Sequence, residues 1–459
     1  MEFEIITAFD KSFGIGKDGF IPWKIKEDLL HFKAITEKNI VVMGRKTYFS
    51  LPVRPLKNRF NIVLTNHTDN YENTENCIFT TKDNLNDLLK TLEADYKKCF
   101  ICGGSDVYKM FLNDCNKLHI TYIDKEYECD TQFPFFPSSL QLSEYTELQY
   151  SISEKCNYRY LTYIKGNNIE SGEKVYLDLI KDILQNGNTR SDRTGTGTIG
   201  VFGRQLKFDI SKTIPFLTTR QVSRKGIIKE LLWFLKGNTD AKLLSKVGVN
   251  IWDANTTREF LDQRNLQHYE EGDIGPMYFY QIYHYNATYR GCNKIYDNEG
   301  LDQMAELING LKNDPFSRRH LLTTYNPLAI KDSVLAPCHG IVIQFYVEEH
   351  DNQKYLSCHM YQRSVDVFLG LTWNIPSYAL LTQIIALEVD MIPKELIIST
   401  GDTHLYLNHV EEAKLLLQRL PLPFPIVRIN QKSIDKYEID DFDIIGYMSH
   451  PPIKAKMAV

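Results

Sequence analysis

The sequence predicts an α/β domain followed by an α+β domain, and three observations lead to this expectation. Apolar, β-branched runs alternate with helical patterns through residues 1–165, which is typical of a mostly parallel, twisted sheet. A polar stretch flanked by glycines follows at 166–172 and is interpreted as a short linker. Residues 173–459 combine helical patterns with aromatic-rich strands, which favours an α+β domain. A length of 459 residues suits two such domains.

The elements of both domains follow from local hydrophobic patterns. In the first domain, apolar and β-branched runs predict strands at 2–8, 40–43, 61–64, 100–102 and 117–123. In the second, apolar residues between 175 and 184 predict an amphipathic helix, and the pattern at 227–235 predicts another. A Thr/Gly-rich loop is expected at 189–198, and strands are expected at 341–347 and 355–361. In the α/β domain, the ligand crevice should lie beyond the carboxyl ends of the strands.

The composition is that of a folded globular protein without a strong charge bias. Fifty-three basic and 58 acidic side chains leave a net charge of −5, which argues against duplex nucleic acid or an anionic membrane as a partner. Nine irregularly spaced cysteines do not suggest a disulfide framework, and we see neither a signal-peptide pattern nor a long apolar run. We therefore expect a cytoplasmic protein without membrane association. Cys99 and Cys102 form a single C-x-x-C pair and the histidines lack metal-ligand spacing, so no metal is expected.

Two glycine-containing turns and one carboxylate are the chemical candidates in the first domain. The segments GRKT at 44–47 and CGGSDVY at 102–108 each lead from a strand into a helix, where free backbone N–H groups can hold a phosphate. Neither carries the full glycine fingerprint of dinucleotide-binding folds. Asp28 shares a predicted helix face with Phe32, and Leu29 is three residues from Phe32, so apolar surroundings should raise the pKa of Asp28. The alternative is an ordinary first-turn aspartate that complements the helix dipole.

Together, these segments resemble dihydrofolate reductase over nearly all of residues 1–165. The resemblance is carried, in order, by Ile15-Gly16, Ile21-Pro22-Trp23, Asp28, Gly44-Arg45-Lys46-Thr47, Arg59, Gly103-Gly104, Thr121, and Asp130-Thr131 before Phe133-Pro134. It implies that Asp28 grips the pterin and assists its protonation, that Thr121 orients this carboxylate, and that Arg59 pairs with the glutamate tail of folate. It also implies folate contacts for Ile6 and Phe32. The implied cofactor is NADPH, and the implied contacts are Ala8, Ile15, Gly16, Gly44, Arg45, Lys46, Thr47, Thr65, Gly103, Gly104, Ser105 and Tyr108.

The second domain contains a cysteine that precedes a predicted strand and several arginines in polar motifs. Cys338 lies in LAPCH, and its neighbour His339 does not by itself indicate a Cys-His dyad, because consecutive strand residues face opposite ways. A reactive thiolate needs positive surroundings, and the arginines of DRTGTGT, DPFSRRH and YQRSVD can supply them. The same guanidinium groups suit a phosphate. Taken singly, the cysteine also fits an inert core thiol, and each arginine also fits an ordinary surface position.

Two further polar residues stand among apolar neighbours. Glu230 shares its predicted helix face with Ile227 and Phe234, so we expect this carboxylate to be buried and to need partners. The alternative is an exposed helix glutamate. Asn374, in WNIPSY, carries an amide that both donates and accepts hydrogen bonds, as recognition of a base edge requires. The alternative is a turn-forming asparagine in a loop.

These segments resemble thymidylate synthase from about residue 173 to residue 459. The motifs DRTGTGT, KELLWFLKG, LAPCH, YQRSVDVFLGLTWNIPSYALL, GDTHLY and KMAV stand in the order of that family. The resemblance implies that Cys338 adds to ring carbon six of dUMP and makes carbon five nucleophilic toward the methylene group of methylenetetrahydrofolate. It implies proton transfers for Glu230, support of proton removal from carbon five for Tyr278, and uracil recognition for Asn374, where relatives that act on cytosine carry aspartate. The implied dUMP contacts are Arg193, Arg318, Arg319, Arg363, Ser364, His339, Asn374, His404 and Tyr406, and the implied folate contacts are Trp252 and Asp366.

One segment of the second domain departs from the family pattern. After Gly275-Pro276-Met277-Tyr278 the family usually continues with glycine and then glutamine, tryptophan and arginine, whereas this chain continues with FYQIYHY at 279–285. If the usual glycine has a positive φ, Phe279 must shift the local backbone, with consequences for the placement of Tyr278. We expect activity to be retained, with an effect on folate affinity left open.

The order of the two domains resembles the bifunctional dihydrofolate reductase-thymidylate synthases. The resemblance implies one folate cycle: the second domain makes dTMP and dihydrofolate, and the first reduces dihydrofolate with NADPH. It also implies a homodimer through the synthase domain, because Arg318 and Arg319 would reach the phosphate of the partner subunit. Two alternatives are a reductase domain that serves only as a structural appendage, and an RNA-binding regulator. The intact Asp28, Arg59 and Thr121 argue against the first, and the net charge of −5 argues against the second.

Overall fold

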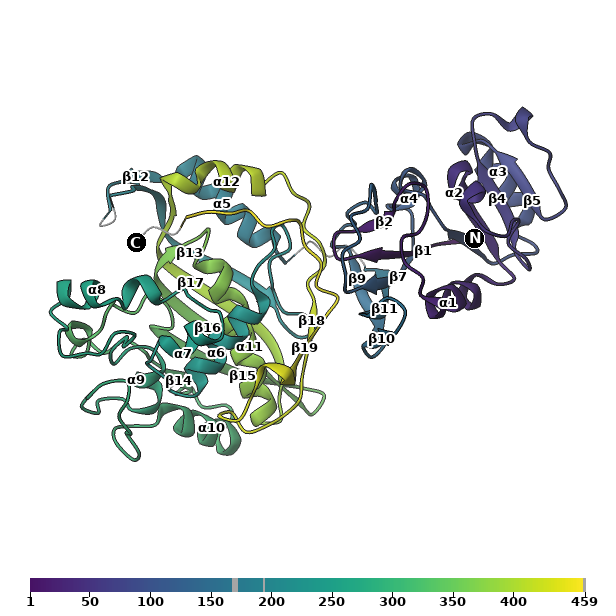
Figure 1. Cartoon of the computed structure of the whole chain (residues 1–459). Helices are drawn as coiled ribbons and strands as arrows, with labels where there is room; N and C mark the ends of the chain where they lie inside the picture. Colours follow the sequence, from purple (N-terminus) through teal and green to yellow (C-terminus); the bar gives the residue numbers. More distant parts are fainter. Residues whose placement is uncertain (167–171, 193–194, 457–459) are drawn as a thin grey trace. The chain divides into compact units, whose positions relative to one another are not determined.

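The structure is a computed structural model that describes residues 1–166, 172–192 and 195–456. The chain divides into two units, Met1–Ser171, coloured purple to blue in Figure 1, and Gly172–Val459, coloured teal to yellow. Residues 167–171, at the centre of the expected linker, lie outside the described part of the chain. None of the described helices is both long and apolar enough to cross a membrane.

The first unit is built on a nine-stranded sheet with the order β10-β11-β7-β1-β6-β3-β4-β5, in which β9 also pairs with β11. All pairs from β7 to β5 are parallel, while the pairs that involve β11 are antiparallel, so the expectation of a mostly parallel sheet is confirmed. The strands of this unit are β1 (Glu2–Asp10), β2 (Gly14–Gly16), β3 (Ile40–Gly44), β4 (Phe60–Leu64), β5 (Cys77–Thr80), β6 (Lys98–Ile101), β7 (Lys117–Ile123), β8 (Thr131–Gln132), β9 (Leu140–Tyr145), β10 (Gln149–Ser151) and β11 (Cys156–Lys165).

The two glycine turns of the first unit are neighbours at the carboxyl ends of β3 and β6. The helices of this unit are α1 (Lys26–Thr36), α2 (Arg45–Ser50), α3 (Lys82–Leu92) and α4 (Ser105–Phe111). Gly44 caps α2, Gly104 caps α4, and the Gly44 N–H donates to the Gly103 carbonyl over 2.7 Å. Gly103 has a φ of 108°, and a Cβ there would lie 3.1 Å from the Tyr108 ring, so the turn requires glycine.

The second unit is built on a six-stranded sheet with the order β12-β13-β17-β16-β15-β14. β16 and β17 are parallel, and the other pairs of the sheet are antiparallel. This mostly antiparallel sheet agrees with the expected α+β class. The strands of this unit, including a separate two-stranded ribbon at its end, are β12 (Asn188–Arg190), β13 (Thr198–Asp209), β14 (Leu321–Leu322), β15 (Val342–His350), β16 (Gln353–Asp366), β17 (Ile392–Tyr406), β18 (Ile426–Ile429) and β19 (Phe442–Ile445).

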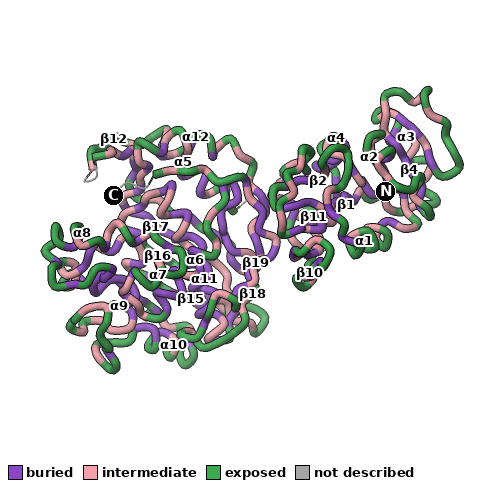
Figure 2. The backbone as a smooth tube through the Cα atoms, in the orientation of Figure 1, coloured by how far each residue is buried: buried purple, intermediate pink, exposed green. Residues whose placement is uncertain are grey.

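Helix α11 forms the centre of the core of the second unit. The helices of this unit are α5 (Lys174–Asn186), α6 (Arg224–Leu235), α7 (Lys242–Lys246), α8 (Arg258–Gln263), α9 (Phe279–Tyr283), α10 (Gln303–Asn313), α11 (Leu371–Glu388) and α12 (Val410–Leu416). α11 packs on β16, β17 and α6, and Figure 2 shows it among mostly buried segments. Apolar residues surround it on nearly every side, which is why it is buried all round rather than amphipathic.

Candidate active sites

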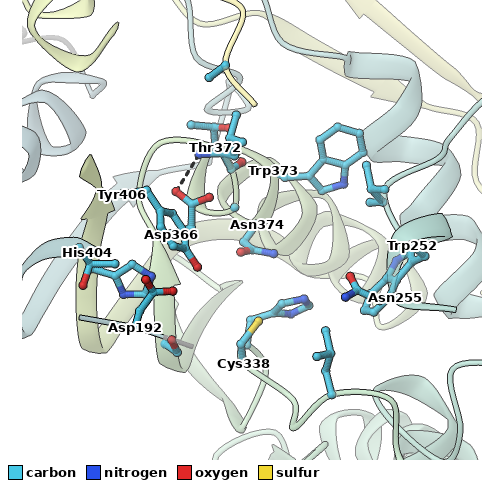
Figure 3. Close-up of a pocket in the computed structure, with 18 of the residues that line it drawn as sticks. Asp192, Trp252, Asn255, Cys338, Asp366, Thr372, Trp373, Asn374, His404 and Tyr406 are labelled. Carbon is cyan, nitrogen blue, oxygen red and sulfur yellow. Dashed lines mark hydrogen bonds between the residues drawn. The ribbon is translucent and has the colours of Figure 1, made fainter. Parts of the chain in front are cut away.

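The main cavity of the second unit has a volume of about 1350 Å³. In Figure 3, Cys338 and Asn374 face each other across its middle, with Asp366, His404 and Tyr406 to one side and Trp252 to the other. Most of the residues that the synthase motifs single out line this one space, although they come from distant parts of the chain. These residues are Glu230, Trp252, Tyr278, Cys338, His339, Arg363, Ser364, Asp366, Asn374, His404 and Tyr406.

Cys338 lies in the loop before β15, and its sulfur lies beside the hydroxyl of Tyr278. The Tyr278 hydroxyl is 3.3 Å from Cys338 Sγ, and it also accepts a hydrogen bond from the Cys338 backbone N–H over 3.3 Å. Because this hydroxyl already accepts one bond, its own proton is free to point at the sulfur. Burial raises the pKa of the Cys338 thiol, while Tyr278 and the charge of Arg363 oppose this rise.

His339 serves as a wall of the site rather than as a base for the cysteine. Its ring stacks on the ring of Tyr278 at a centroid distance of 4.4 Å, and its Nδ1 lies 2.8 Å from the hydroxyl of Tyr378. Burial lowers the pKa of His339 to about 3, so the imidazole is neutral at physiological pH. A neutral ring cannot stabilise a thiolate by charge, which agrees with the expectation that the two neighbours do not form a Cys-His dyad.

Glu230 projects from α6 and is only 5% exposed, so the buried interpretation of this residue is confirmed. Its two carboxylate oxygens accept hydrogen bonds from the indole N–H groups of Trp252 and Trp373. Burial raises the pKa of Glu230 to about 7, and the two indole donors oppose this rise. A carboxyl with this pKa can exchange a proton near neutral pH.

Asn374 lies on α11, so the alternative of a turn-forming asparagine in a loop is wrong. The buried helix continues through Pro376 because apolar contacts on all its sides hold it in place. The side chain of Asn374 is 7% exposed, and its Oδ1 accepts a hydrogen bond from Gln362 Nε2 over 2.9 Å. The amide NH₂ of Asn374 is thereby the group left to meet a ligand in the cavity.

The predicted phosphate-binding arginines do not all meet in one chain. Arg363 lines the cavity, and its guanidinium donates to the carbonyls of Ala336 and Pro337, next to Cys338. Arg318 and Arg319 are exposed in the segment before β14 and do not line the cavity. Arg193 lies outside the described residues. Among the predicted arginines that the structure describes, Arg363 is therefore the one that lies in the cavity with Cys338. Burial has a larger effect on the pKa of the Cys338 thiol than the charge of Arg363.

The reductase residues meet at α1 and β7. Thr121 Oγ1 donates to Asp28 Oδ1 over 2.6 Å. Burial raises the pKa of Asp28, as the apolar spacing predicts, and the hydrogen bond from Thr121 opposes the rise. Leu29, three residues before Phe32 on α1, is 60% exposed.

The other predicted reductase residues are held by short-range contacts. Arg59 is 8% exposed, its Nε donates to Thr36 Oγ1 over 2.8 Å, and its guanidinium lies 5.6 Å from the centre of the Phe32 ring. Tyr108, on α4, donates its hydroxyl proton to the Ile6 carbonyl. The remaining cofactor candidates lie in β1 (Ala8), β2 (Ile15, Gly16), the end of β3 and α2 (Gly44, Arg45, Lys46, Thr47), just after β4 (Thr65), and the turn into α4 (Gly103, Gly104, Ser105).

Several residues that complete the site were not singled out from the sequence. Gln362 holds Asn374, Trp373 holds Glu230, Tyr378 contacts His339, and His404 Nδ1 lies 3.0 Å from an oxygen of Asp402. All of these partners lie within motifs that the sequence offers, YQRSVDVFLGLTWNIPSY and GDTHLY. A sequence motif, however, does not show which side chains elsewhere in the chain its residues will contact.

Comparison with known proteins matches each unit to an enzyme family. The family model for dihydrofolate reductase matches residues 2–165, and the model for thymidylate synthase matches residues 174–459. Similar proteins include a bifunctional dihydrofolate reductase-thymidylate synthase of Paramecium tetraurelia, 40% identical over all of this chain and 99% of that protein. Another, of Arabidopsis thaliana, is 39% identical over 100% and 88% of the two chains, and one of Leishmania major is 37% identical over 100% and 95%. The chain therefore belongs to the bifunctional dihydrofolate reductase-thymidylate synthase family, in which one unit reduces dihydrofolate with NADPH and the other methylates dUMP with a folate cosubstrate.

Proposed function

We propose that Cys338 is the nucleophile of the synthase reaction and that it attacks ring carbon six of dUMP. The observation that carries this proposal is the position of its sulfur in the main cavity, 3.3 Å from the Tyr278 hydroxyl and opposite Asn374. When the C6–S bond forms, the electron pair of the C5=C6 bond moves to carbon five, which then attacks the methylene carbon of the folate cosubstrate. Loss of the carbon-five proton and cleavage of the bond between the methylene carbon and the folate nitrogen leave an exocyclic methylene group on the base and free tetrahydrofolate. A hydride from the tetrahydrofolate then reduces this methylene to the methyl group, the C5=C6 bond re-forms as the C6–S bond to Cys338 breaks, and the folate leaves as dihydrofolate.

Tyr278 and Glu230 are the proposed proton-transfer residues of this site. The Tyr278 hydroxyl, which accepts the Cys338 N–H, is positioned to take part in removing the carbon-five proton. The Glu230 carboxyl, with a pKa of about 7, is suited to organise water and to exchange protons during the addition. His339 stays neutral and walls the cavity.

Asn374 is the proposed base-reading residue and favours uracil. Because Gln362 occupies its Oδ1, the amide NH₂ group faces the cavity as a donor. Oxygen four of uracil accepts such a bond, whereas the exocyclic amine of cytosine would face it donor to donor. An unpaired buried polar group costs about 1–3 kcal/mol, which is enough to discriminate between the two bases. His404 and Tyr406 are proposed to bind the ribose, and Asp366 and Trp252 are proposed to contact the folate.

The phosphate of dUMP is proposed to be bound by two copies of the chain. Arg363 and Ser364 line the cavity, and Arg193 is proposed to join them, but Arg318 and Arg319 are exposed away from this space. The sheet of the same unit exposes several large apolar side chains, Phe202 on β13, Tyr346 on β15 and Tyr361 on β16, and Phe202 is 80% exposed. A second copy that packs on this sheet would bury such side chains and could deliver its two arginines to the site, so we propose a homodimer.

In the reductase unit, Asp28 is the proposed pterin-binding carboxyl. Thr121 holds one of its oxygens, and Ile6, Phe32 and Arg59 complete the proposed folate site. The glycine turns at Gly44 and Gly103-Gly104, with the side chains predicted from the sequence, are proposed to hold NADPH, which supplies the hydride. In support, a Cβ at Gly44, Gly103 or Gly104 would lie 3.1–3.2 Å from neighbouring atoms, so these turns need glycine, and no described side chain caps the starts of α2 and α4.

The test of the coupled function supplies dUMP, methylenetetrahydrofolate and NADPH together. We expect NADPH oxidation only when dUMP is present, with one NADPH consumed for each dTMP formed once the reaction is steady. A Cys338→Ala chain should lose this coupled oxidation yet still reduce added dihydrofolate, and an Asp28→Asn chain should form dTMP while dihydrofolate accumulates. NADPH oxidation that does not depend on dUMP would refute the coupled cycle.

The test of the homodimer mixes two inactive chains. An Arg319→Ala chain lacks the arginine that it gives to its partner, and a Cys338→Ala chain lacks the nucleophile. Random exchange makes half of the dimers mixed, and each mixed dimer contains one complete site, so about one quarter of wild-type synthase activity should return. Recovery of no activity after the subunits have exchanged would exclude a shared site.

A cytoplasmic location is also proposed. All nine cysteines are free thiols in the structure, and thiols persist in reducing compartments. Fractionation of the source cells with an antibody to this chain tests the location, and a signal confined to an organelle would contradict it.

A further inference from the structure

Tyr278 holds an unusual backbone conformation at the most reactive point of the synthase site. Its φ is 50° and its ψ is −119°, in a region that residues with a side chain rarely adopt, and it immediately precedes α9. Such a conformation persists only where the surrounding structure holds it. The next residue, Phe279, has no positive φ, so the positive φ in this departing segment belongs to Tyr278.

The ring of Tyr278 is enclosed by other rings. His339 stacks on it at 4.4 Å with an interplanar angle of 25°, Phe234 lies 5.2 Å away, and Trp252 meets it edge-on at 5.8 Å. Of these three rings, His339 and Trp252 also line the cavity, whereas Phe234 is buried in the core and does not line it. The position of the Tyr278 hydroxyl beside Cys338 therefore depends on where the Phe234 ring stands.

Phe279 is the residue that holds the Phe234 ring. The two rings are nearly parallel, at 21°, with centroids 5.3 Å apart, and both side chains are buried. Phe279 thus acts on Tyr278 by two routes, directly as its neighbour in the chain and through the ring of Phe234. Aromatic pairs of this kind have a preferred geometry, so the row Phe279, Phe234, Tyr278 resists displacement more than aliphatic side chains would.

We infer that Phe279 is a positioning residue for the synthase reaction, which fixes the Tyr278 hydroxyl beside the sulfur of Cys338 through the ring of Phe234. The inference rests on the proposed role of Tyr278 in removing the carbon-five proton. Phe279 does not line the cavity. Its loss should therefore slow the chemical step while dUMP binding stays nearly unchanged.

The test compares Phe279→Ala with Phe279→Leu and with Phe208→Ala in the full chain. Phe208 is an equally buried phenylalanine on β13 in the same core, so its truncation removes the same volume away from the Tyr278 ring. Rates are expressed per site that binds dUMP, which removes any effect of partial unfolding. We expect Phe279→Ala to lower kcat about tenfold, equivalent to about 1.4 kcal/mol, with less than a twofold change in dUMP affinity. Phe279→Leu should recover part of the rate, and Phe208→Ala should keep the wild-type kcat.

A second readout follows the proton itself. Release of tritium from carbon five of labelled dUMP should fall in parallel with kcat in Phe279→Ala. A wild-type kcat per site in Phe279→Ala, or an equal loss in Phe208→Ala, would overturn the inference. The Tyr278→Phe variant distinguishes failure of this inference from failure of the proposed role of Tyr278. If Tyr278→Phe is slow while Phe279→Ala has the wild-type kcat, only the inference about Phe279 fails. If Tyr278→Phe keeps the wild-type kcat, the proposed role of Tyr278 fails and the inference fails with it.

Discussion

Replacement of Glu230 by glutamine tests the electrostatics of the synthase site in one substitution. In the structure, both carboxylate oxygens accept indole N–H groups, and burial raises the pKa of the group from 4.5 to about 7. A carboxyl whose pKa is raised by folding binds its proton more tightly in the folded chain. Its contribution to stability is therefore complete below pH 4.5 and is lost as the pH rises through the folded value of about 7.

The size of the effect follows from the same two values. At about 1.4 kcal/mol for each pH unit between them, the ionised carboxylate of Glu230 destabilises the fold by about 3 kcal/mol at pH 8. Glutamine cannot ionise, so it removes this pH-dependent cost. It also places an NH₂ group against one of the two indole donors, a mismatch that costs about 1–3 kcal/mol at every pH. Glu230→Gln should thus be less stable than wild type at pH 5 and about equal to it at pH 8.

The measurement is urea unfolding of both chains at several pH values, followed by tryptophan fluorescence. Three of the four tryptophans, Trp233, Trp252 and Trp373, lie in the synthase unit and report on it. The difference in unfolding free energy between the chains should change by more than 2 kcal/mol from pH 5 to pH 8, in favour of the variant. Glu271→Gln, at an exposed position of the same unit, is the control for the removal of one carboxylate.

Activity supplies an independent check on Glu230. Loss of a positioned proton-transfer group lowers kcat by about 100-fold or more, so Glu230→Gln should be slow at every pH while it binds dUMP. The break near neutral pH in the wild-type rate profile should be absent from the residual activity of the variant. A stability difference that stays flat between pH 5 and pH 8 would refute the raised pKa, and with it the reasoning from burial.

Three further substitutions test the other assignments. Thr121→Val removes the hydrogen bond that lowers the pKa of Asp28, so the break in the pH profile of dihydrofolate reduction should move to higher pH; an unmoved break would disconnect Asp28 from that profile. Asn374→Asp presents a hydrogen-bond acceptor to the base in place of a donor. Methylation of dUMP should therefore fall about 10- to 100-fold, and dCMP should become a substrate. An unchanged preference for dUMP over dCMP would contradict the proposed recognition of uracil by Asn374. Arg45→Ala should weaken binding of NADPH about tenfold or more and of NADH little, as a fluorescence titration can show, and an equal loss for both would place Arg45 away from the extra phosphate.

The sequence alone determined most of the organisation of this protein. Alternation of apolar runs and helical patterns located the strands that became β1, β3, β4, β6 and β7, because a strand needs only a short stretch of β-branched and apolar residues. The glycines before α2 and α4 could be found because turns that approach another backbone exclude side chains. Glu230 was identifiable because apolar residues share its helix face, whereas Cys338 and Arg363 were identifiable only through the order of the motifs in which they stand.

Only the tertiary structure decided how these residues act on one another. Glu230 meets Trp252 and Trp373, which are 22 and 143 positions away in the chain, and no local pattern contains such a pairing. The same holds for Asn374. Its sequence context fits either a turn-forming asparagine in a loop or a base-reading residue, and the buried helix α11 places it in the cavity opposite Cys338. Burial, which depends on every element that packs around a group, decided that the Cys338 thiol has a raised pKa and that His339 is neutral. Sequence patterns describe neighbours along the chain, whereas desolvation and hydrogen bonding depend on neighbours in space.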